Sequence, residues 1–369
     1  MPDVTLYGIP HSLYAGRARS YLIKAGIAYR ELAPNTEHYF QNVLPKAGGR
    51  SSMPTLELAD GRVIRDGAAI IDHFENETGH AFSPRLPKQR FFSRLFDVIG
   101  AEGLLRPAMH YRWNFDAENI DFLRFHMSLL SGGDLELAGK FVENMRRAAR
   151  QFGVSPDTFE LIETLYSELL AALDRHFKQY PYLFGGRPSI GDFGMIAPLW
   201  GHLGRDPKPL SLMQRHGMHV LRWVERMNRH DADLVGFEDW DAAYLEGDEL
   251  PDTLIDLLSV LAVDFVPETI AAARHLNTWL DEQDDLQPGA VCKRGLGFAS
   301  FEIRGTPISA LAQPYRFYLL KRAQDEYAAM GDVDRRSIDA MLKKANMAAV
   351  HDAKLTRDIG RENNLEVWL

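Results

Sequence analysis

The spacing of apolar residues in the first 80 positions predicts short strands and two helices. Within residues 15–25, four apolar side chains recur at intervals of three and four residues, which is the period of one helix face. Gly26 follows, and glycine is common directly after the last helical residue. The predicted order is a strand at 4–8, a helix at 15–25, a strand at 28–32, a hairpin of 55–58 and 62–64, and a helix that begins at 66.

Beyond residue 80 the apolar pattern has helical spacing almost throughout, and Pro84 and Pro87 mark the change. The run 180–188 is rich in turn residues. Ser189, with Asp192 three residues later, is typical of a capped helix start and not of a catalytic carboxylate. The helices predicted in this part are 88–112, 118–131, 134–152, 156–179, one beginning at 190, and 211–229.

The last third of the chain has a mixed pattern. Residues 252–283 are strongly helical apart from Pro267. Residues 298–303 alternate in the way of a strand and, with Gly305 and Pro307 after them, predict a hairpin or short strand pair. Further helices are predicted at 313–330 and 333–350. The whole pattern predicts an α+β protein with three parts, which are 1–80, an all-helical 88–239, and a mainly helical 240–369.

Composition narrows the class of protein. Apolar residues make up 46% of the chain and charged residues 25%, as in ordinary globular proteins. The formal net charge of −9 is opposite to what a nucleic-acid partner requires. We expect a cytoplasmic protein, because the sequence shows no signal-peptide pattern and no long apolar run for a membrane span. Cys292 is the single cysteine, which excludes an intrachain disulfide.

Two segments near the hairpin have the features of a binding site. Pro54 opens the first strand of the hairpin, where its missing N–H is tolerated, and we expect a cis Met53–Pro54 bond. Asp66 and Gly67 begin a helix, whose free N–H groups and positive dipole end suit a small anion. The sequence therefore predicts an anion site beside the Met53–Pro54 bond.

Four segments, taken in order, resemble those of glutathione transferases: Leu6–Arg19, Met53–Pro54, Asp66–Ile70 and Tyr182–Phe193. The resemblance covers residues 1 to about 235. It implies a thioredoxin-like, glutathione-binding domain at 1–80 and the all-helical C-terminal domain of the family at 88–239. Residues 240–369 are then an extension that the usual two-domain member does not have. Two positions depart from the family pattern: Gly67 replaces a serine, and Leu13 follows Ser12 in place of proline.

The resemblance implies that glutathione is the co-substrate and that a hydroxyl group stabilises its thiolate, which is the nucleophile. Ser12 is the first candidate for this catalytic role, with Tyr7 second and Tyr14 third. Ser12 also has a plainer interpretation, as a residue that caps the helix which follows it.

The same resemblance assigns the remaining contacts of glutathione. Met53 and Pro54 would pair with its cysteinyl backbone. Asp66 would accept its γ-glutamyl ammonium group, and the backbone N–H of Gly67 would substitute for the missing serine. Arg50 would meet its glycyl carboxylate. The alternatives are a helix-dipole charge for Asp66 and a solvated loop charge for Arg50. The histidines show no metal-binding pattern, so no metal site is predicted.

The predicted function is that of a glutathione transferase, an enzyme of detoxification that activates the thiol for attack on a hydrophobic small-molecule electrophile. Conjugation, ether or halide cleavage and isomerisation all begin with this thiolate. The electrophile is expected between the two domains, lined by the helices 88–112 and 211–229. Six side chains are candidates for an apolar wall there, and the alternative, which is the commoner one for such a stripe, is that they belong to the core: Met109, His110, Tyr111, Trp113, Phe115 and Trp200. A homodimer is expected from the resemblance. The alternative is a non-catalytic binding or scaffold protein on the same fold.

Overall fold

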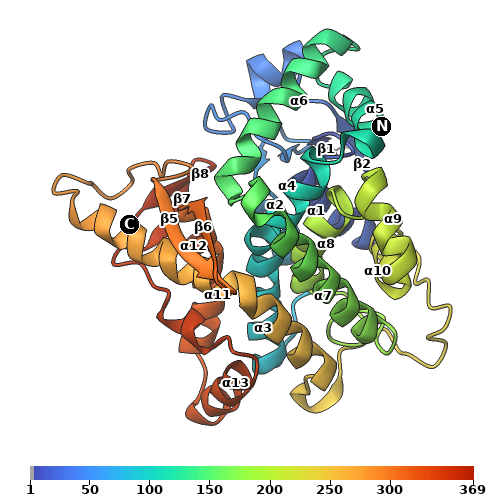
Figure 1. Ribbon diagram of the computed structural model, residues 1–369, viewed down its shortest axis with the longest axis vertical. Helices are drawn as coiled ribbons and strands as arrows, with labels where there is room; N and C mark the ends of the chain where they lie inside the picture. Colours follow the sequence, from blue (N-terminus) through green and yellow to red (C-terminus); the bar gives the residue numbers. More distant parts are fainter. Residues whose placement is uncertain (1–3) are drawn as a thin grey trace.

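The computed structural model describes residues 4–369 (Figure 1). Its first part is a four-stranded, thioredoxin-like sheet with helical segments on both faces. The strands lie in the order β2-β1-β3-β4. β1 is parallel to β2 and antiparallel to β3, and β4 is antiparallel to β3. The elements of this part are β1 (Val4–Tyr7), α1 (Leu13–Lys24), β2 (Tyr29–Leu32), a π-helical turn η1 (Tyr39–Val43), β3 (Thr55–Glu57), β4 (Val63–Arg65) and α2 (Gly67–Glu77).

Alternation along β1 explains how both faces of this sheet are covered. Leu6 is fully buried in the core that includes α1 and α2. Its neighbour Tyr7 points to the opposite face, as successive residues of a strand do, and packs there against Tyr39 and Val43 of η1. The predicted strands and helices of this part are therefore present, with shifts of a few residues at their ends.

The second part is entirely helical. The predicted helix 88–112 is interrupted by a π-helical turn, and the predicted helix 211–229 is instead two helices separated by Gly217. The elements are α3 (Pro87–Val98), the π-helical turn η2 (Ile99–Gly103), α4 (Leu105–Trp113), α5 (Asp116–Ser128), α6 (Leu135–Ala149), η3 (Arg150–Phe152), η4 (Pro156–Thr158), α7 (Phe159–Phe177), α8 (Ile190–Gly201), α9 (Pro207–His216) and α10 (Met218–Met227).

Helix α8 lies at the centre and packs against both α1 and α3. Its start is the predicted capping box, in which the Asp192 carboxylate accepts from the Ser189 N–H at 2.8 Å and from the Trp223 indole at 3.1 Å. Gly194 permits the close approach to α3, because a Cβ there would lie 2.4 Å from the Cα atom of Asp97. Asp192 is thus a structural residue, as the sequence predicts.

Residues 240–369, called the extension here, are packed along one side of the other two parts (Figure 1). They contain the predicted hairpin, and also a second hairpin at the C-terminal end that the sequence analysis overlooked. The elements are η5 (Glu246–Asp248), α11 (Asp252–Asp281), β5 (Phe298–Ile303), β6 (Thr306–Leu311), α12 (Pro314–Ala328), α13 (Asp332–Lys344), η6 (Ala348–Asp352), β7 (Ile359–Glu362) and β8 (Leu365–Trp368).

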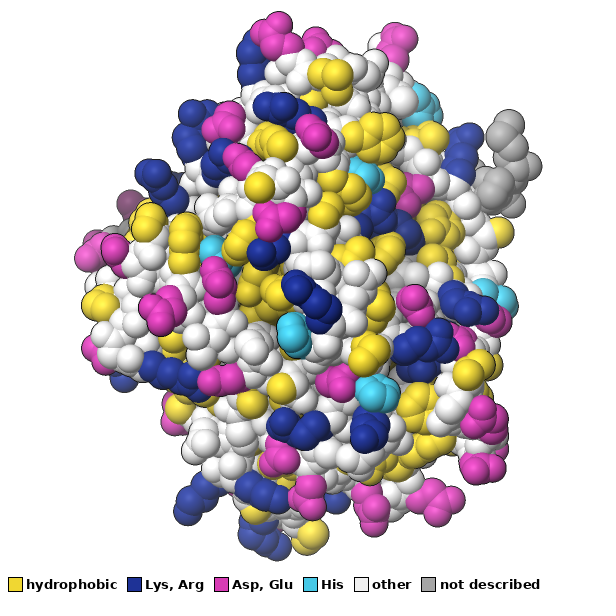
Figure 2. All heavy atoms as spheres, turned by 45° about the vertical axis from the view of Figure 1, so that its right-hand side comes forward, with side chains coloured by type: hydrophobic (Ala, Val, Ile, Leu, Met, Phe, Trp, Pro, Cys, Tyr) yellow, Lys and Arg dark blue, Asp and Glu magenta, His cyan; other side chains and the backbone are white. Residues whose placement is uncertain are grey.

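Charge is mixed over the surface. On the face of the described residues shown in Figure 2, Lys and Arg side chains lie among Asp and Glu side chains, with no large area of one sign. Among residues 4–369, no helix combines the length and apolar character that crossing a membrane requires.

Buried arginines join elements that are distant in sequence. Arg112 of α4 is 2% exposed and forms a bidentate pair with Asp206, at 2.6 and 2.7 Å. The same guanidinium donates to the carbonyl oxygens of His11 and Gly201, at 2.9 and 2.6 Å. It therefore ties α4 both to the loop before α1 and to the end of α8.

This geometry gives a stability prediction for Arg112→Met. The substitution leaves the Asp206 carboxylate buried without its partner, so we expect the free energy of unfolding to fall by about 3–5 kcal/mol. Urea denaturation followed by circular dichroism measures the change. Asp60→Asn is the matched control, since the Asp60–Arg62 pair is exposed, and it should leave the unfolding midpoint unchanged. Equal midpoints for Arg112→Met and wild type would contradict the prediction.

Candidate functional site

The three segments that the sequence analysis singled out meet at one end of the sheet. Tyr7, at the end of β1, pairs with Thr55 at the start of β3, and Thr55 pairs with Arg65 at the end of β4. The N–H of Asp66 donates to the carbonyl oxygen of Pro54 at 3.0 Å. The loop with Ser12, the Met53–Pro54 bond and the start of α2 therefore adjoin one another, and the Met53–Pro54 bond is cis as predicted.

Ser12 is the N-cap residue of α1. Its Oγ accepts a hydrogen bond from the Ala15 N–H at 3.3 Å, and the residue is half-buried. The hydroxyl hydrogen remains free for a ligand, because accepting this bond does not use it. The position also lies at the positive end of the α1 dipole. Ser12 thus combines the capping role with a donor that is available to an anion.

The two tyrosine candidates are engaged elsewhere. The Tyr7 hydroxyl donates to Glu57 at 2.9 Å, and Glu57 pairs with Thr5, further from the meeting point of the segments. The Tyr14 hydroxyl donates to Glu102 at 3.3 Å. Burial, together with these carboxylates, raises the pKa of both phenols above the ordinary value. The Tyr7 hydroxyl is therefore bonded away from the Ser12 loop, and the Tyr14 hydroxyl points towards Glu102 of η2.

Asp66 holds the start of α2 with an unusual backbone conformation, φ 89°. Its Oδ1 accepts from the N–H groups of Ala68 and Ala69 at 2.9 and 3.1 Å. Its Oδ2 accepts from the Tyr315 hydroxyl of α12 at 2.7 Å. Burial acts to raise the pKa of this carboxyl, but Arg361, Tyr315 and the helix N–H groups outweigh it, so the pKa is lowered. The ionised Asp66 carboxylate can therefore accept one further hydrogen bond, at Oδ2.

Several backbone groups at this end of the sheet have no partner. Among residues 4–369, no protein group hydrogen-bonds the N–H or C=O of Met53 or the N–H of Gly67. Gly67 lies close to Pro54 and to the Tyr14 carbonyl, since a Cβ there would be 3.7 and 3.4 Å from them. The Met53 backbone and the Gly67 N–H are thus free to hold an extended ligand with an anionic group at its end.

The extension holds Arg50, the candidate for the glycyl carboxylate. Its guanidinium donates to the Cys292 carbonyl oxygen at 3.0 Å and to the Glu366 carboxylate at 3.3 Å. Arg294 donates to the carbonyl oxygen of Ser51 at 3.1 Å. The loop before Met53 is therefore fastened from outside by the extension.

The second hairpin covers the open edge of β4. The side chain of Asn364 accepts from the Arg65 N–H at 3.0 Å and donates to the Val63 carbonyl oxygen at 2.9 Å, as a neighbouring strand would. Asn363 and Asn364 both have positive φ in the two-residue turn between β7 and β8. Two asparagines between short alternating segments are a recognised hairpin signal, so this element was within reach of sequence reasoning.

Glu102 is the functional-site candidate that sequence reasoning missed. It is 3% exposed in η2, a π-helical turn of the kind often found at functional sites, and it accepts the Tyr14 hydrogen bond. Its Oε2 has no partner among the described residues. Burial raises its pKa to about 7, against the opposing effect of Arg316. No local pattern marks this residue, because its burial depends on α11 and α12 of the extension.

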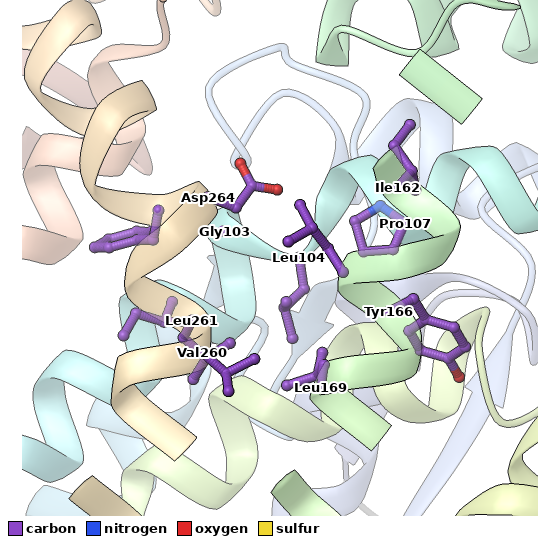
Figure 3. A pocket seen from close by; sticks show the side chains of 12 residues that line it. Gly103, Leu104, Pro107, Ile162, Tyr166, Leu169, Val260, Leu261 and Asp264 are labelled. Atoms are coloured by element: carbon purple, nitrogen blue, oxygen red, sulfur yellow. The ribbon is translucent and has the colours of Figure 1, made fainter. Parts of the chain in front are cut away.

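Four of the six side chains considered for the electrophile wall lie in the protein core. Met109, His110, Tyr111 and Trp113 are all buried, and Tyr111 stacks on Phe115. A crevice does lie between α4, α7 and α11, and its lining includes Leu104, Pro107, Leu169 and Leu261 (Figure 3). Its volume of about 30 Å³ holds only one or two water molecules. Of the two interpretations, the core one therefore holds for these four buried residues, whereas Phe115 and Trp200 are half-buried.

The raised pKa of Glu102 predicts how stability depends on pH. As pH rises from 4.5 to 7, Glu102 loses its proton in the unfolded chain but keeps it in the native state. The contribution of Glu102 to the free energy of unfolding therefore falls over this range. Glu102→Gln removes the effect, and its stability relative to wild type should rise across this window by on the order of 3 kcal/mol. Chemical denaturation at several pH values tests this, with the exposed Glu160→Gln as control. Parallel pH profiles for wild type and Glu102→Gln would rule the prediction out.

Several solved structures resemble the chain at low identity. The beta-etherase LigF from Sphingobium sp. strain SYK-6 is 16% identical, with a TM-score of 0.43 over 64% of this chain and 99% of the other. The theta class glutathione S-transferase from Xanthomonas axonopodis pv. citri, with glutathione bound, is 20% identical, with a TM-score of 0.39 over 64% and 98%. A GST-like protein from Pseudomonas syringae is 16% identical, with a TM-score of 0.42 over 85% and 97%. No curated protein matches the chain.

Two family models match the sequence itself. The glutathione S-transferase N-terminal domain matches residues 6–81, which hold Ser12, the cis Met53–Pro54 bond and the start of α2. The glutathione S-transferase C-terminal domain matches residues 156–226, which hold the capping box of α8. The two matches stand in the family's order, and each falls on the corresponding part of the fold. The chain therefore belongs to the glutathione transferase superfamily.

Proposed function

We propose that this protein is a glutathione transferase-like enzyme, which binds a glutathione-type thiol and directs it at a hydrophobic electrophile. The observation that carries the proposal is the set of polar groups left without partners where the three segments meet. These are the hydroxyl hydrogen of Ser12, the backbone of Met53 and the N–H of Gly67. Gly67 is buried, whereas Ser12 and Met53 are half-buried and can be reached from outside. Unpaired donors and acceptors gathered at one end of the sheet favour a ligand that supplies their partners.

Each free group suits one part of the thiol ligand. The Met53 N–H and C=O pair with the cysteinyl backbone, as one strand pairs with another. The Gly67 N–H, at the positive end of α2, donates to the γ-glutamyl carboxylate. Asp66 accepts the γ-glutamyl ammonium group beside the Tyr315 hydroxyl. The ligand is thereby held with its sulfur towards the Ser12 loop.

The chemistry proposed for Ser12 is stabilisation of the thiolate. Its hydroxyl donates a hydrogen bond to the sulfur anion, and the α1 dipole adds to this effect, so the thiol loses its proton to water more readily. The sulfur then attacks an electrophilic carbon. With an aromatic halide, a C–S bond forms while halide leaves with its bonding electron pair.

A non-catalytic protein on the same fold is the second candidate. It is favoured by the contacts of the extension, because Tyr315 already donates to Asp66 and Glu366 already pairs with Arg50. It is favoured also by the small volume of the crevice between α7 and α11. Such a protein either binds the thiol without turning it over or does not bind it.

The test of the enzymatic proposal is Ser12→Ala, with Ser12→Thr as the matched variant that keeps a hydroxyl. We expect Ser12→Ala to lower the rate of conjugation to a chlorodinitrobenzene by about 10²- to 10³-fold, because one donor to the developing anion is lost. Glutathione affinity should change little. Thermal denaturation controls for the lost helix cap, which costs about 1 kcal/mol.

Tyr7→Phe should leave the rate unchanged, since its hydroxyl is held by Glu57. A wild-type rate equal to the uncatalysed rate, with glutathione bound, would favour the non-catalytic alternative. A catalysed rate that is equal in wild type and Ser12→Ala would contradict the role proposed for Ser12. If glutathione at millimolar concentration binds to none of the variants, the proposed thiol site is contradicted.

A homodimer is part of the proposal and is supported by apolar side chains that α5 and α6 leave exposed. Phe125 is 62% exposed and Leu135 is 63% exposed. We expect sedimentation equilibrium to give twice the chain mass of 41.8 kDa. Phe125→Asp should shift the population towards monomer if this face forms the contact. A wild-type species at the mass of one chain alone would contradict the dimer.

A further inference from the structure

The extension places an arginine that has no carboxylate partner at the loop which leads to Met53. Arg294 is exposed, and its guanidinium donates to the Ser51 carbonyl oxygen at 3.1 Å. Within residues 4–369 this is its one hydrogen bond, and no carboxylate pairs with it. Arg294 therefore presents a positive charge and most of its N–H groups to solvent, beside a residue two positions before Met53.

The segment that carries Arg294 is fixed on both sides. Two residues before it, the Cys292 N–H donates to the Glu366 carbonyl oxygen of β8 at 2.8 Å. Two residues after it, the Leu296 N–H donates to the Ala312 carbonyl oxygen at 3.0 Å. The fold of the extension therefore sets the position of this arginine.

Positive charge is in excess next to Arg294. Three guanidinium groups share one carboxylate, that of Glu366, at 3.3, 2.7 and 2.6 Å, and they belong to Arg50, Arg65 and Arg361. Burial, together with Arg65 and Arg294, lowers the pKa of Arg50 against the opposing effect of Glu366. The Nε atom of Arg50 has no partner among the described residues. A further carboxylate is therefore favoured here, because it finds free donors and offsets the repulsion among the guanidinium groups.

We infer that Arg294 and Arg50 bind the carboxylate at the far end of the ligand, which in glutathione is the glycyl carboxylate, and that Arg294 is a specificity-determining residue. This role rests on the proposed function. An extended ligand that pairs with Met53 and has its γ-glutamyl end at Gly67 directs its other end towards the residues before Met53, where both guanidinium groups lie. Arg294 belongs to the extension, so a segment outside the thioredoxin-like domain takes part in selecting the ligand.

Isothermal titration calorimetry of the full chain tests this with glutathione and with glutathione C-terminal amide, which lacks only the glycyl charge. Wild type should bind glutathione at least about tenfold more tightly than the amide, because the amide loses charge-assisted hydrogen bonds. Arg294→Gln should lower this ratio of affinities by about threefold, since one exposed charge is lost. Arg294→Lys keeps the charge and should retain most of the ratio. Arg294→Gln combined with Arg50→Gln should bring the ratio close to one.

Arg336→Gln on α13 is the matched control, because it removes the same charge from another exposed arginine of the extension. It should leave the ratio at its wild-type value. A purely structural effect of a substitution weakens the binding of both ligands together and does not change their ratio. A ratio near one in wild type, or a ratio that Arg294→Gln leaves unchanged, would overturn this role of Arg294 and leave the proposed function standing. Binding of neither ligand to wild type would overturn the proposed function and this role with it.

Discussion

Burial of arginine is the physical constraint on which the rest of this structure depends. A guanidinium cannot lose its charge, so each buried one must find carboxylate or carbonyl partners, and here those partners come from distant segments. Arg17 pairs with Asp97 across α1 and α3, and Arg112 with Asp206 across α4 and α9. Arg106 and Arg316 both bind Glu268, which joins α4 and α12 to α11. Removing a sole carboxylate partner, such as Asp97 or Asp206, leaves an uncompensated buried charge, so these pairs fasten distant segments to one another.

The same constraint makes the extension part of the candidate site. Arg65, at the end of β4, donates to Glu366 and Asn364 of the C-terminal hairpin and, at 3.5 Å, to the Ser52 hydroxyl. The Asn364 side chain of that hairpin also hydrogen-bonds the backbone of Val63 and Arg65, which covers an open strand edge of the kind that favours aggregation. The ligand end of the thioredoxin-like sheet is thereby built from both ends of the chain, with Asp66 and Arg50 from one and Tyr315 and Glu366 from the other.

Sequence reasoning succeeded where neighbours along the chain decide the outcome. Ser189 and Asp192 form their capping box within four residues, and Gly26 follows α1 with positive φ because no side chain opposes it. It also predicted that Ser12, Met53 and Asp66 belong to one site, because strand order and register follow from short connections. Sequence reasoning left the aromatic residues of the second part open between core and pocket wall, because aromatic residues at helical spacing suit both, and most of them are buried. It overlooked β7 and β8, although the Asn363–Asn364 turn carried a local signal.

The sequence by itself determined the strands and helices of the first part, the cap of α8, the cis Met53–Pro54 bond and the family. All of these depend on local sterics, local hydrogen bonds and the period of apolar residues. Only the tertiary structure decided that Tyr14 reaches Glu102, that burial brings the pKa of Glu102 to about 7, and that Glu366 lies at Arg50. The physical reason is that burial and charge pairing depend on which distant segments pack together. No local pattern of residues predicts the contact between Arg50 and Glu366, because they lie 316 positions apart in the sequence.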